Sequence, residues 1–182
     1  MGRPKNFNRM QVLEKALPLF WKRGYADTGL KDIEKATGVN KSGLYSEFKD
    51  KQDLYLAALR HYVTTRRRDT LSLEPQGWDN IEAYLKMRAA SKDGNKGCFA
   101  VNSMREADLL PDEAQAIINE NRNALKALLR RNIEAERTRL PAETITEMLS
   151  TFLSGLSIEI NMKVGKSPPR KVEDLMRVLR AL

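Results

Sequence analysis

The chain has 182 residues, of which 31% are charged and 41% hydrophobic, and its formal net charge at pH 7 is +8. These proportions are ordinary for a soluble globular protein that can bury a core as one or two domains. No apolar run approaches the roughly 20 residues of a membrane-spanning helix, and no apolar stretch typical of a signal peptide follows the N-terminus. A single cysteine excludes an internal disulfide, so we expect a cytoplasmic protein without membrane contact.

Positive charge is concentrated in the first part of the chain. Residues 1–70 carry a net charge of +7, from 15 Lys and Arg against 8 Asp and Glu, whereas residues 71–182 carry +1. A basic end on a nearly neutral body indicates a polyanionic partner, because neutralising phosphates supplies much of the binding to nucleic acid. A basic surface with no partner is an equally good interpretation of the charge alone.

The chain opens with an extended basic arm over residues 2–6. Pro4 keeps the residue before it out of the helical region of backbone conformation. Arg3 and Lys5 are candidates for contact with a minor groove, as in other basic arms. A disordered, solvated tail is the alternative interpretation.

The next stretch is a compact helical motif. A first helix is expected over residues 8–23, where Gly24 can end it. Residues 24–54 then predict two short helices joined by a tight turn, followed by the start of a third. Gly38 suits a positive φ just past a helix end, and Asn40 suits the N-cap of the next helix.

The short apolar faces of these helices are too small to be stable alone, so they must pack on each other and on a neighbour. This packing leaves small, basic and hydroxylic side chains on the outside of the second short helix. Such a helix has the shape that a major groove accepts. The outward residues are Lys41, Ser42, Gly43, Tyr45 and Ser46.

A family resemblance appears at these residues. The run T-x-x-x-x-I-x-x-x-x-G-V-x-x-x-x-L-Y-x-x-F-x-x-K-x-x-L, from Thr28 to Leu54, resembles the DNA-binding domain of the tetracycline-repressor-like (TetR/AcrR) transcription factors. The sequence departs from the family pattern in three places. Glu34 and Thr37 stand where small residues are usual, and Glu47 stands where the family often has His.

The resemblance implies an all-α fold with a three-helix, helix-turn-helix DNA-binding domain over residues 1–50. A helical domain for ligand sensing and dimerisation would follow over residues 51–182, with a helix over 51–68 connecting the two. The DNA-binding residues would be Thr28, Lys41, Ser42, Gly43, Tyr45, Lys51, Arg3 and Lys5. Thr28 is also expected to cap the second helix of the motif.

The remainder of the chain has helical periodicity throughout. Residues 78–91 and 98–110 predict helices, and three more begin near Pro111, Pro141 and Pro168. The stretch 70–77 contains Pro and Gly, which predicts a loop. This loop is the most favoured position for a domain boundary. With no strand signal of useful length and no repeat, the sequence predicts about nine helices.

The sequence shows no enzyme motif: no Gly-rich phosphate loop, no G-x-S-x-G and no His pair for a metal. We therefore expect no catalysis, no metal and no cofactor. His61, the only histidine, is expected to be structural or to lie on the surface, with a sensing role as the lesser alternative. Cys98 has the surroundings of a small buried hydrophobe, with a redox role as the lesser alternative.

The resemblance also implies a pocket for a small-molecule effector in the C-terminal body, walled by helices. Several polar or polarisable residues on otherwise apolar faces are candidates to line it. A polar residue there can equally be satisfied by a backbone group, and this alternative also covers Asn132. The candidates are Tyr62, Met87, Cys98, Asn102 and Asn121.

The last two predicted helices present more apolar side chains than one side of a small bundle needs. The resemblance implies that they form the four-helix bundle of a two-fold homodimer, and small residues at the seam would permit close packing. The alternative is that this stripe is the internal core. The candidate interface residues are Phe152, Leu153, Gly155, Leu156, Leu175 and Leu179.

Together these expectations describe a ligand-responsive transcriptional regulator. It would bind a palindromic double-stranded DNA operator as a homodimer and is expected to be a repressor. The alternative function is a helical small-molecule-binding protein whose helix-turn-helix segment has a role other than DNA binding.

Overall fold

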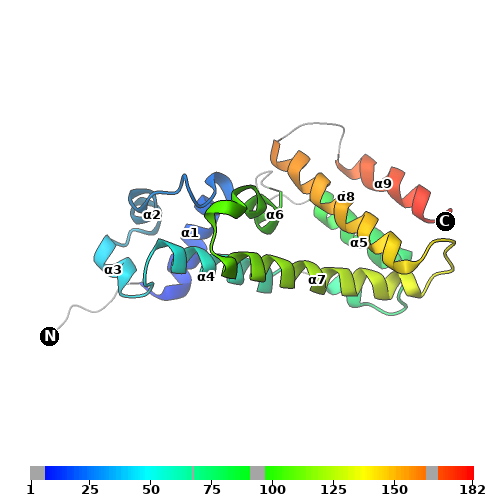
Figure 1. Ribbon diagram of the computed structural model, residues 1–182, viewed down its shortest axis with the longest axis horizontal. Coiled ribbons are helices and arrows are strands. Elements are labelled where there is room, and N and C mark those ends of the chain that lie inside the picture. Colours follow the sequence, from blue (N-terminus) through cyan, green and yellow to red (C-terminus); the bar gives the residue numbers. More distant parts are fainter. Residues whose placement is uncertain (1–6, 67, 91–96, 163–167) are drawn as a thin grey trace. The chain divides into compact units, whose positions relative to one another are not determined.

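The computed structural model describes residues 7–66, 68–90, 97–162 and 168–182. Within these residues the regular structure is helical, as predicted for an all-α protein, with nine α-helices and two short 3₁₀ helices (Figure 1). The elements are α1 (Arg9–Arg23), α2 (Leu30–Thr37), α3 (Lys41–Tyr45), α4 (Lys51–Thr64), η1 (Asp69–Ser72), α5 (Trp78–Ala89), α6 (Phe99–Ser103), η2 (Met104–Leu109), α7 (Asp112–Glu134), α8 (Ala142–Met162) and α9 (Pro168–Leu179).

The chain divides into two compact units, each made of two separate stretches. Unit 1 consists of Met1–Thr65 and Asn102–Ile117, and unit 2 consists of Arg66–Val101 and Ile118–Leu182. Unit 1 therefore contains α1 to α4, α6 from its fourth residue, η2 and the first turns of α7. The predicted functional division at residue 50 stays a prediction, but α4 packs on α1 within unit 1.

In unit 1, α1 packs on both α2 and α4, and α2 packs on α3. A capping box forms at the start of α1, where the Asn8 side chain accepts from the Gln11 N–H at 2.8 Å. Gly24 ends this helix with a φ of +89°, and α1 runs through Pro18 without a break. The side chains of Ile33 and Ala16 have no exposed surface.

Two predicted helix boundaries in this unit are wrong. Gly29, not Thr28, is the N-cap of α2, because the Thr28 hydroxyl donates instead to the Gly24 carbonyl at 2.6 Å. Moreover α4 ends at Thr64 rather than near residue 68, since the Thr65 N–H and hydroxyl both bond to the His61 carbonyl and close the helix there.

The helix predicted over residues 98–110 is also interrupted. It forms one turn of α-helix, α6, and continues as the 3₁₀ helix η2. Glu106 has a non-helical backbone conformation, with φ −116° and ψ 23°. The apolar periodicity therefore marked a helical region correctly but could not show that its hydrogen bonding changes at Met104.

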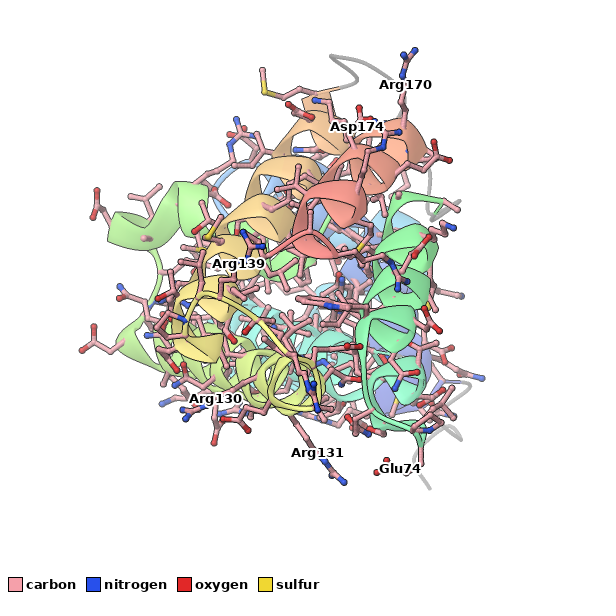
Figure 2. All side chains as sticks on the ribbon, turned by 90° about the vertical axis from the view of Figure 1, so that its right-hand side faces the viewer. Glu74, Arg130, Arg131, Arg139, Arg170 and Asp174 are labelled. Carbon is pink, nitrogen blue, oxygen red and sulfur yellow. The ribbon has the colours of Figure 1, made fainter. Side chains whose placement is uncertain are left out.

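In unit 2, α5 packs against η1, α8 and α9 around an apolar core. The loop before α5 is held by the buried amide of Asn132 on α7, which accepts from the Gly77 N–H at 3.1 Å and donates to the Leu71 carbonyl at 2.9 Å. Figure 2 shows Arg131 of α7 directed toward Glu74 in the same loop, and their side chains form an ion pair at 3.0 Å. Asn132 is thus satisfied by backbone groups, which was the alternative to a role in binding an effector.

No helix in the described part of the chain combines the length and apolar character needed to span a membrane. Nor do the described residues contain a group of three or more His, Cys, Asp or Glu side chains that could hold a metal ion.

Candidate nucleic-acid interface

The short helix α3 is fixed at its N-terminus by two side chains. The Asn40 side chain, its N-cap, accepts from the Gly43 N–H at 2.9 Å, as predicted. Glu34 of α2 accepts from the Lys41 N–H at 2.5 Å. A five-residue helix cannot be stable alone, so these two caps and the buried Leu44 hold it in place.

The turn between α2 and α3 is equally well satisfied. Gly38 has a φ of +73°, in the left-handed region that the sequence predicted. The buried Thr37 hydroxyl donates to the Ile33 carbonyl at 2.7 Å and accepts from the Val39 N–H at 3.1 Å. Two departures from the family pattern, Glu34 and Thr37, thus each have a structural partner.

The outer face of α3 carries three of the predicted DNA-binding residues. Lys41, Ser42 and Tyr45 are all exposed, and 42% of the Tyr45 surface is accessible. The Lys41 ammonium lies 5.8 Å from the centre of the Tyr45 ring. A cation, a hydroxyl and a phenol on one exposed turn can donate hydrogen bonds to phosphates or base edges.

Gly43 has a packing role in addition to the one predicted. A Cβ atom added there would lie 2.6 Å from Cγ1 of Val39 and 3.0 Å from Cζ of Phe7. The missing side chain therefore points at the apolar side chains of Val39 and Phe7. Gly43 thus has a role in internal packing, and its close approach to DNA stays a prediction.

Arg9, at the start of α1, is a residue that the sequence analysis missed. Its guanidinium lies 4.1 Å from the centre of the Phe48 ring and donates to the Glu47 carbonyl. It thus adds a cation beside the end of α3. A basic residue next to a helix start is common, so only the contact with Phe48 singles it out.

The turn between α1 and α2 is held from both sides by charged groups. The Lys51 ammonium donates to the Tyr25 carbonyl at 2.9 Å and to the Thr28 carbonyl at 3.1 Å. On the other side, the Glu106 carboxylate accepts from the N–H groups of Tyr25 and Ala26 at 2.7 and 2.9 Å.

Two predicted DNA contacts need correction in this light. The Thr28 side chain is completely buried, so its hydroxyl does not face DNA. Lys51 serves the turn through two hydrogen bonds, which is a structural role beside the predicted phosphate contact. Arg3 and Lys5 lie outside the described residues.

A buried tyrosine lies behind the same turn. The Tyr55 hydroxyl donates to the Ser103 hydroxyl at 2.7 Å, and its ring packs edge-on against Phe20 and Tyr25. Burial raises the pKa of Tyr55 to about 12, and the negative charge of Glu106 adds to the rise.

The predicted effector residues fall in both units. In unit 1, Tyr62 is buried against Trp21, with 4.9 Å between ring centres, and Asn102 donates to the Trp21 carbonyl at 3.4 Å. In unit 2, Asn121 accepts from Arg68, Met87 packs on the core and Cys98 is buried.

Unit 2 also contains a partly buried arginine that the sequence analysis missed. The Arg66 guanidinium hydrogen-bonds to the side chain of the buried Tyr84, with Cys98 and Arg88 also near enough to act on its charge. Burial lowers the pKa of Arg66 from its usual value. No local pattern marks Arg66, because its direction depends on where α4 ends.

The predicted dimer residues are mostly part of the protomer core. Leu156 and Leu179 are buried within unit 2, so they are not available to a second chain. Phe152, Leu153 and Leu175 are partly buried against the same core, and Gly155 is exposed. The exposed large apolar side chains of α8 and α9 are instead Met148, Ile158, Met162 and Val178.

Comparison with known proteins agrees with this geometry. The family described as "Bacterial regulatory proteins, tetR family" matches residues 12–58. The HTH-type transcriptional repressor ComR of Escherichia coli (strain K12) is 31% identical over 172 residues, covering 86% of this chain and 81% of ComR. The repressor BdcR of the same strain is 26% identical over 159 residues, covering 86% of this chain and 80% of its own.

Solved structures give the same result for the whole fold. A cysteine mutant of the TetR family transcriptional regulator CifR, complexed with 26-base-pair double-strand operator DNA, has a TM-score of 0.84 and 26% identity, covering 98% of this chain and all of that chain. Reduced NemR of Escherichia coli has a TM-score of 0.80 at 18% identity, covering 94% and 96%. The chain therefore belongs to the TetR family of bacterial regulatory proteins and is a DNA-binding transcriptional regulator.

Proposed function

We propose that this protein is a ligand-responsive repressor that binds a palindromic operator as a homodimer, with α3 of each subunit in the major groove. The exposed group Lys41, Ser42 and Tyr45 on the capped helix α3 supports this proposal most directly. Two copies of α3 would have to lie about 34–36 Å apart, one turn of B-DNA. The protein would act in the cytoplasm, and we propose no catalytic activity for it.

The test uses duplex fragments selected from genomic DNA by binding to the intact protein. We expect Lys41→Ala to weaken binding by about 1–3 kcal/mol and to reduce the salt dependence by about one phosphate contact. Tyr45→Phe should weaken binding by removing one hydroxyl donor. Arg170→Ala is the charge-matched control, because Arg170 projects from α9 into solvent (Figure 2).

If both α3 variants bind the selected DNA as tightly as the control, α3 is not the reading surface. If the wild-type protein binds no duplex even at low salt, the alternative function gains support: a helical small-molecule-binding protein whose helix-turn-helix serves another purpose.

Homodimers and small-molecule effectors are typical of the family. We propose that the second copy covers the exposed apolar side chains of α8 and α9. Ile158 is 41% exposed, Met162 62% and Val178 56%, and burying such side chains between two copies would stabilise a dimer. Gly155 on α8 would let the partner backbone approach, because nothing lies within 4 Å of a Cβ added there.

We further propose that the effector binds in unit 2 near Cys98 and carries a negative charge. The observation that supports this is the gathering of two guanidinium groups, Arg66 and Arg88, beside the buried Tyr84. Both arginines are partly buried. Two cations in a partly desolvated place repel each other, and an anionic group between them relieves the repulsion.

This proposal is tested with small aromatic and aliphatic carboxylic acids, each paired with its methyl ester. We expect the acids, but not the esters, to raise the melting temperature of the wild-type protein and to weaken its binding to DNA. Arg66→Gln should abolish both effects, while Arg105→Gln, at an exposed position of unit 1, should not. Equal effects of acids and esters would contradict an anionic effector.

A further inference from the structure

We propose that Glu106 is a positioning residue for DNA binding: it holds the turn between α1 and α2 in place from a segment whose two ends continue into unit 2. The inference depends on the proposed DNA-binding function. It adds a residue about 80 positions along the chain from the turn that it binds to the set that determines operator affinity.

The contact is specific. The two carboxylate oxygens of Glu106 each accept one backbone N–H, from Tyr25 at 2.7 Å and from Ala26 at 2.9 Å. Charge-assisted hydrogen bonds of this kind are stronger than those between neutral groups. The carboxylate thereby fixes the backbone just after the C-terminus of α1.

Gly24 makes room for this carboxylate. A Cβ atom on Gly24 would lie 2.3 Å from one Glu106 oxygen, and the φ of +89° is strained for any residue with a side chain. The turn is therefore shaped to receive Glu106. Lys51 holds the opposite side by donating to the carbonyls of Tyr25 and Thr28.

The turn leads directly into the reading surface. It joins α1 to α2, and Glu34 and Thr37 of α2 fix the start of α3. A displacement of the turn consequently moves α2 and, with it, Lys41 and its neighbours on α3.

The segment that carries Glu106 is continuous along the chain with unit 2 at both ends, which suits it to carry a conformational change from unit 2 to the turn. Residues 102–117 belong to unit 1, whereas the chain on both sides of them belongs to unit 2. Further contacts join the segment to α4: the hydrogen bond from Tyr55 to Ser103 and the ion pair of Arg60 with Glu113. Of the residues in this segment for which hydrogen bonds are described here, Glu106 is the one that binds the turn between α1 and α2.

The experiment compares Glu106→Gln with Glu113→Gln in the full-length protein. Both changes remove one negative charge from the same segment and keep the size of the side chain. Affinity for the selected DNA fragments is measured over a range of salt concentrations, at a temperature where circular dichroism shows both variants folded. Hydrogen exchange of the Tyr25 and Ala26 amides is followed by mass spectrometry.

We expect Glu106→Gln to bind DNA about tenfold more weakly than Glu113→Gln. The slope of affinity against salt should stay unchanged, because Glu106 contacts no phosphate. The turn amides should exchange faster in Glu106→Gln only. A residue that served stability alone would lower the melting temperature but leave the affinity of the folded protein unaltered.

Equal or tighter DNA binding by Glu106→Gln overturns the inference while leaving the proposed function intact. Failure of the wild-type protein to bind any duplex would instead reject the proposed function. The two failures are therefore distinguishable.

Discussion

At the scale of single residues, the N-terminus of α3 depends on acceptors from outside the helix. Glu34 binds the Lys41 N–H and Asn40 binds the Gly43 N–H. The carboxylate also lies where the helix dipole is positive. Two of the first backbone donors of α3 are therefore used internally, which leaves side chains, rather than the helix end, to contact DNA.

Gly43→Ala is expected to damage the reading surface although alanine is the better helix former. The added methyl group would collide with Val39 Cγ1 at 2.6 Å, and overpacking of this kind costs about 1–3 kcal/mol. We expect a lower melting temperature and weaker DNA binding.

A double-mutant cycle checks the cause of that loss. Val39→Ala opens space beside the new methyl group, so Gly43→Ala should be less harmful when combined with Val39→Ala than in the wild-type background. Additive effects of the two changes would show that the collision is not responsible.

The sequence predicted the exposure of Lys41 and Tyr45 because the helical period sets which side of a short helix faces outward. It did not predict the burial of Thr28 or the hydrogen bonds of Lys51. Those depend on the backbone course of the turn between α1 and α2, which no local pattern encodes.

At the scale of elements, the loop before α5 is organised by one side chain. Asn132 accepts from Gly77 and Asn80 and donates to the carbonyls of Leu71 and Leu128. It thereby attaches α7 to η1 and to the start of α5 without being exposed.

Asn132→Ala should therefore lower the free energy of unfolding by at least about 3 kcal/mol, because several buried donors and acceptors lose their partner. Asn123→Ala, at an exposed position of the same helix, should change it by less than about 0.5 kcal/mol. Urea unfolding followed by circular dichroism measures both. Similar values for the two variants would contradict the role of Asn132.

Helix starts were more predictable than helix ends. Asn40 caps the helix that the sequence assigned to it, and the side chains of Asn8 and Asp50 cap α1 and α4 in the same way, because a cap needs only a side-chain oxygen and nearby N–H groups. The end of α4 and the change from α6 to η2 are not marked by glycine or proline. They follow from tertiary contacts that form after the helices meet.

At the scale of the whole molecule, the sequence predicted the helix order and the helix-turn-helix but not the composition of unit 1. Residues 102–117 join that unit through contacts such as Glu106 with Tyr25. Partners so far apart along the chain leave no periodic signal. The same limit explains why Leu156 and Leu179 could not be assigned to the core rather than to a dimer interface.

The assembly proposed above leads to a prediction about oligomeric state. Ile158→Glu should convert the dimer to a monomer, because a carboxylate placed in an apolar interface would be desolvated without a partner. Leu73→Glu is the control, since Leu73 is 56% exposed but lies outside α8 and α9. Light scattering after size-exclusion chromatography gives the mass, and a dimeric Ile158→Glu protein would place the interface elsewhere.

Stability at alkaline pH should depend on Tyr55. The unfolded chain releases its phenolic proton near the ordinary pKa of 10.0 and the folded chain at about 12, so folding favours the neutral form. This contribution is complete below pH 10 and is lost as the pH rises toward 12, by up to about 3 kcal/mol.

Urea unfolding at pH 9 and pH 11 tests the dependence on Tyr55. Tyr55→Phe should be less stable than the wild-type protein at pH 9, since Ser103 loses its hydrogen bond, but should lose less stability between the two pH values. Parallel losses in both proteins would assign the alkaline effect to other groups.

Unit 1 consists of two separate stretches of the chain, and this matters for any truncation meant to isolate the DNA-binding helices. A gene fragment that stops at residue 65 would encode α1 to α4 but would omit Glu106 and Ser103. Such a fragment would expose the Tyr55 hydroxyl and the amides after Gly24 to water. The shortest fragment that retains all of unit 1 therefore extends past residue 117 and includes residues 66–101, which belong to unit 2.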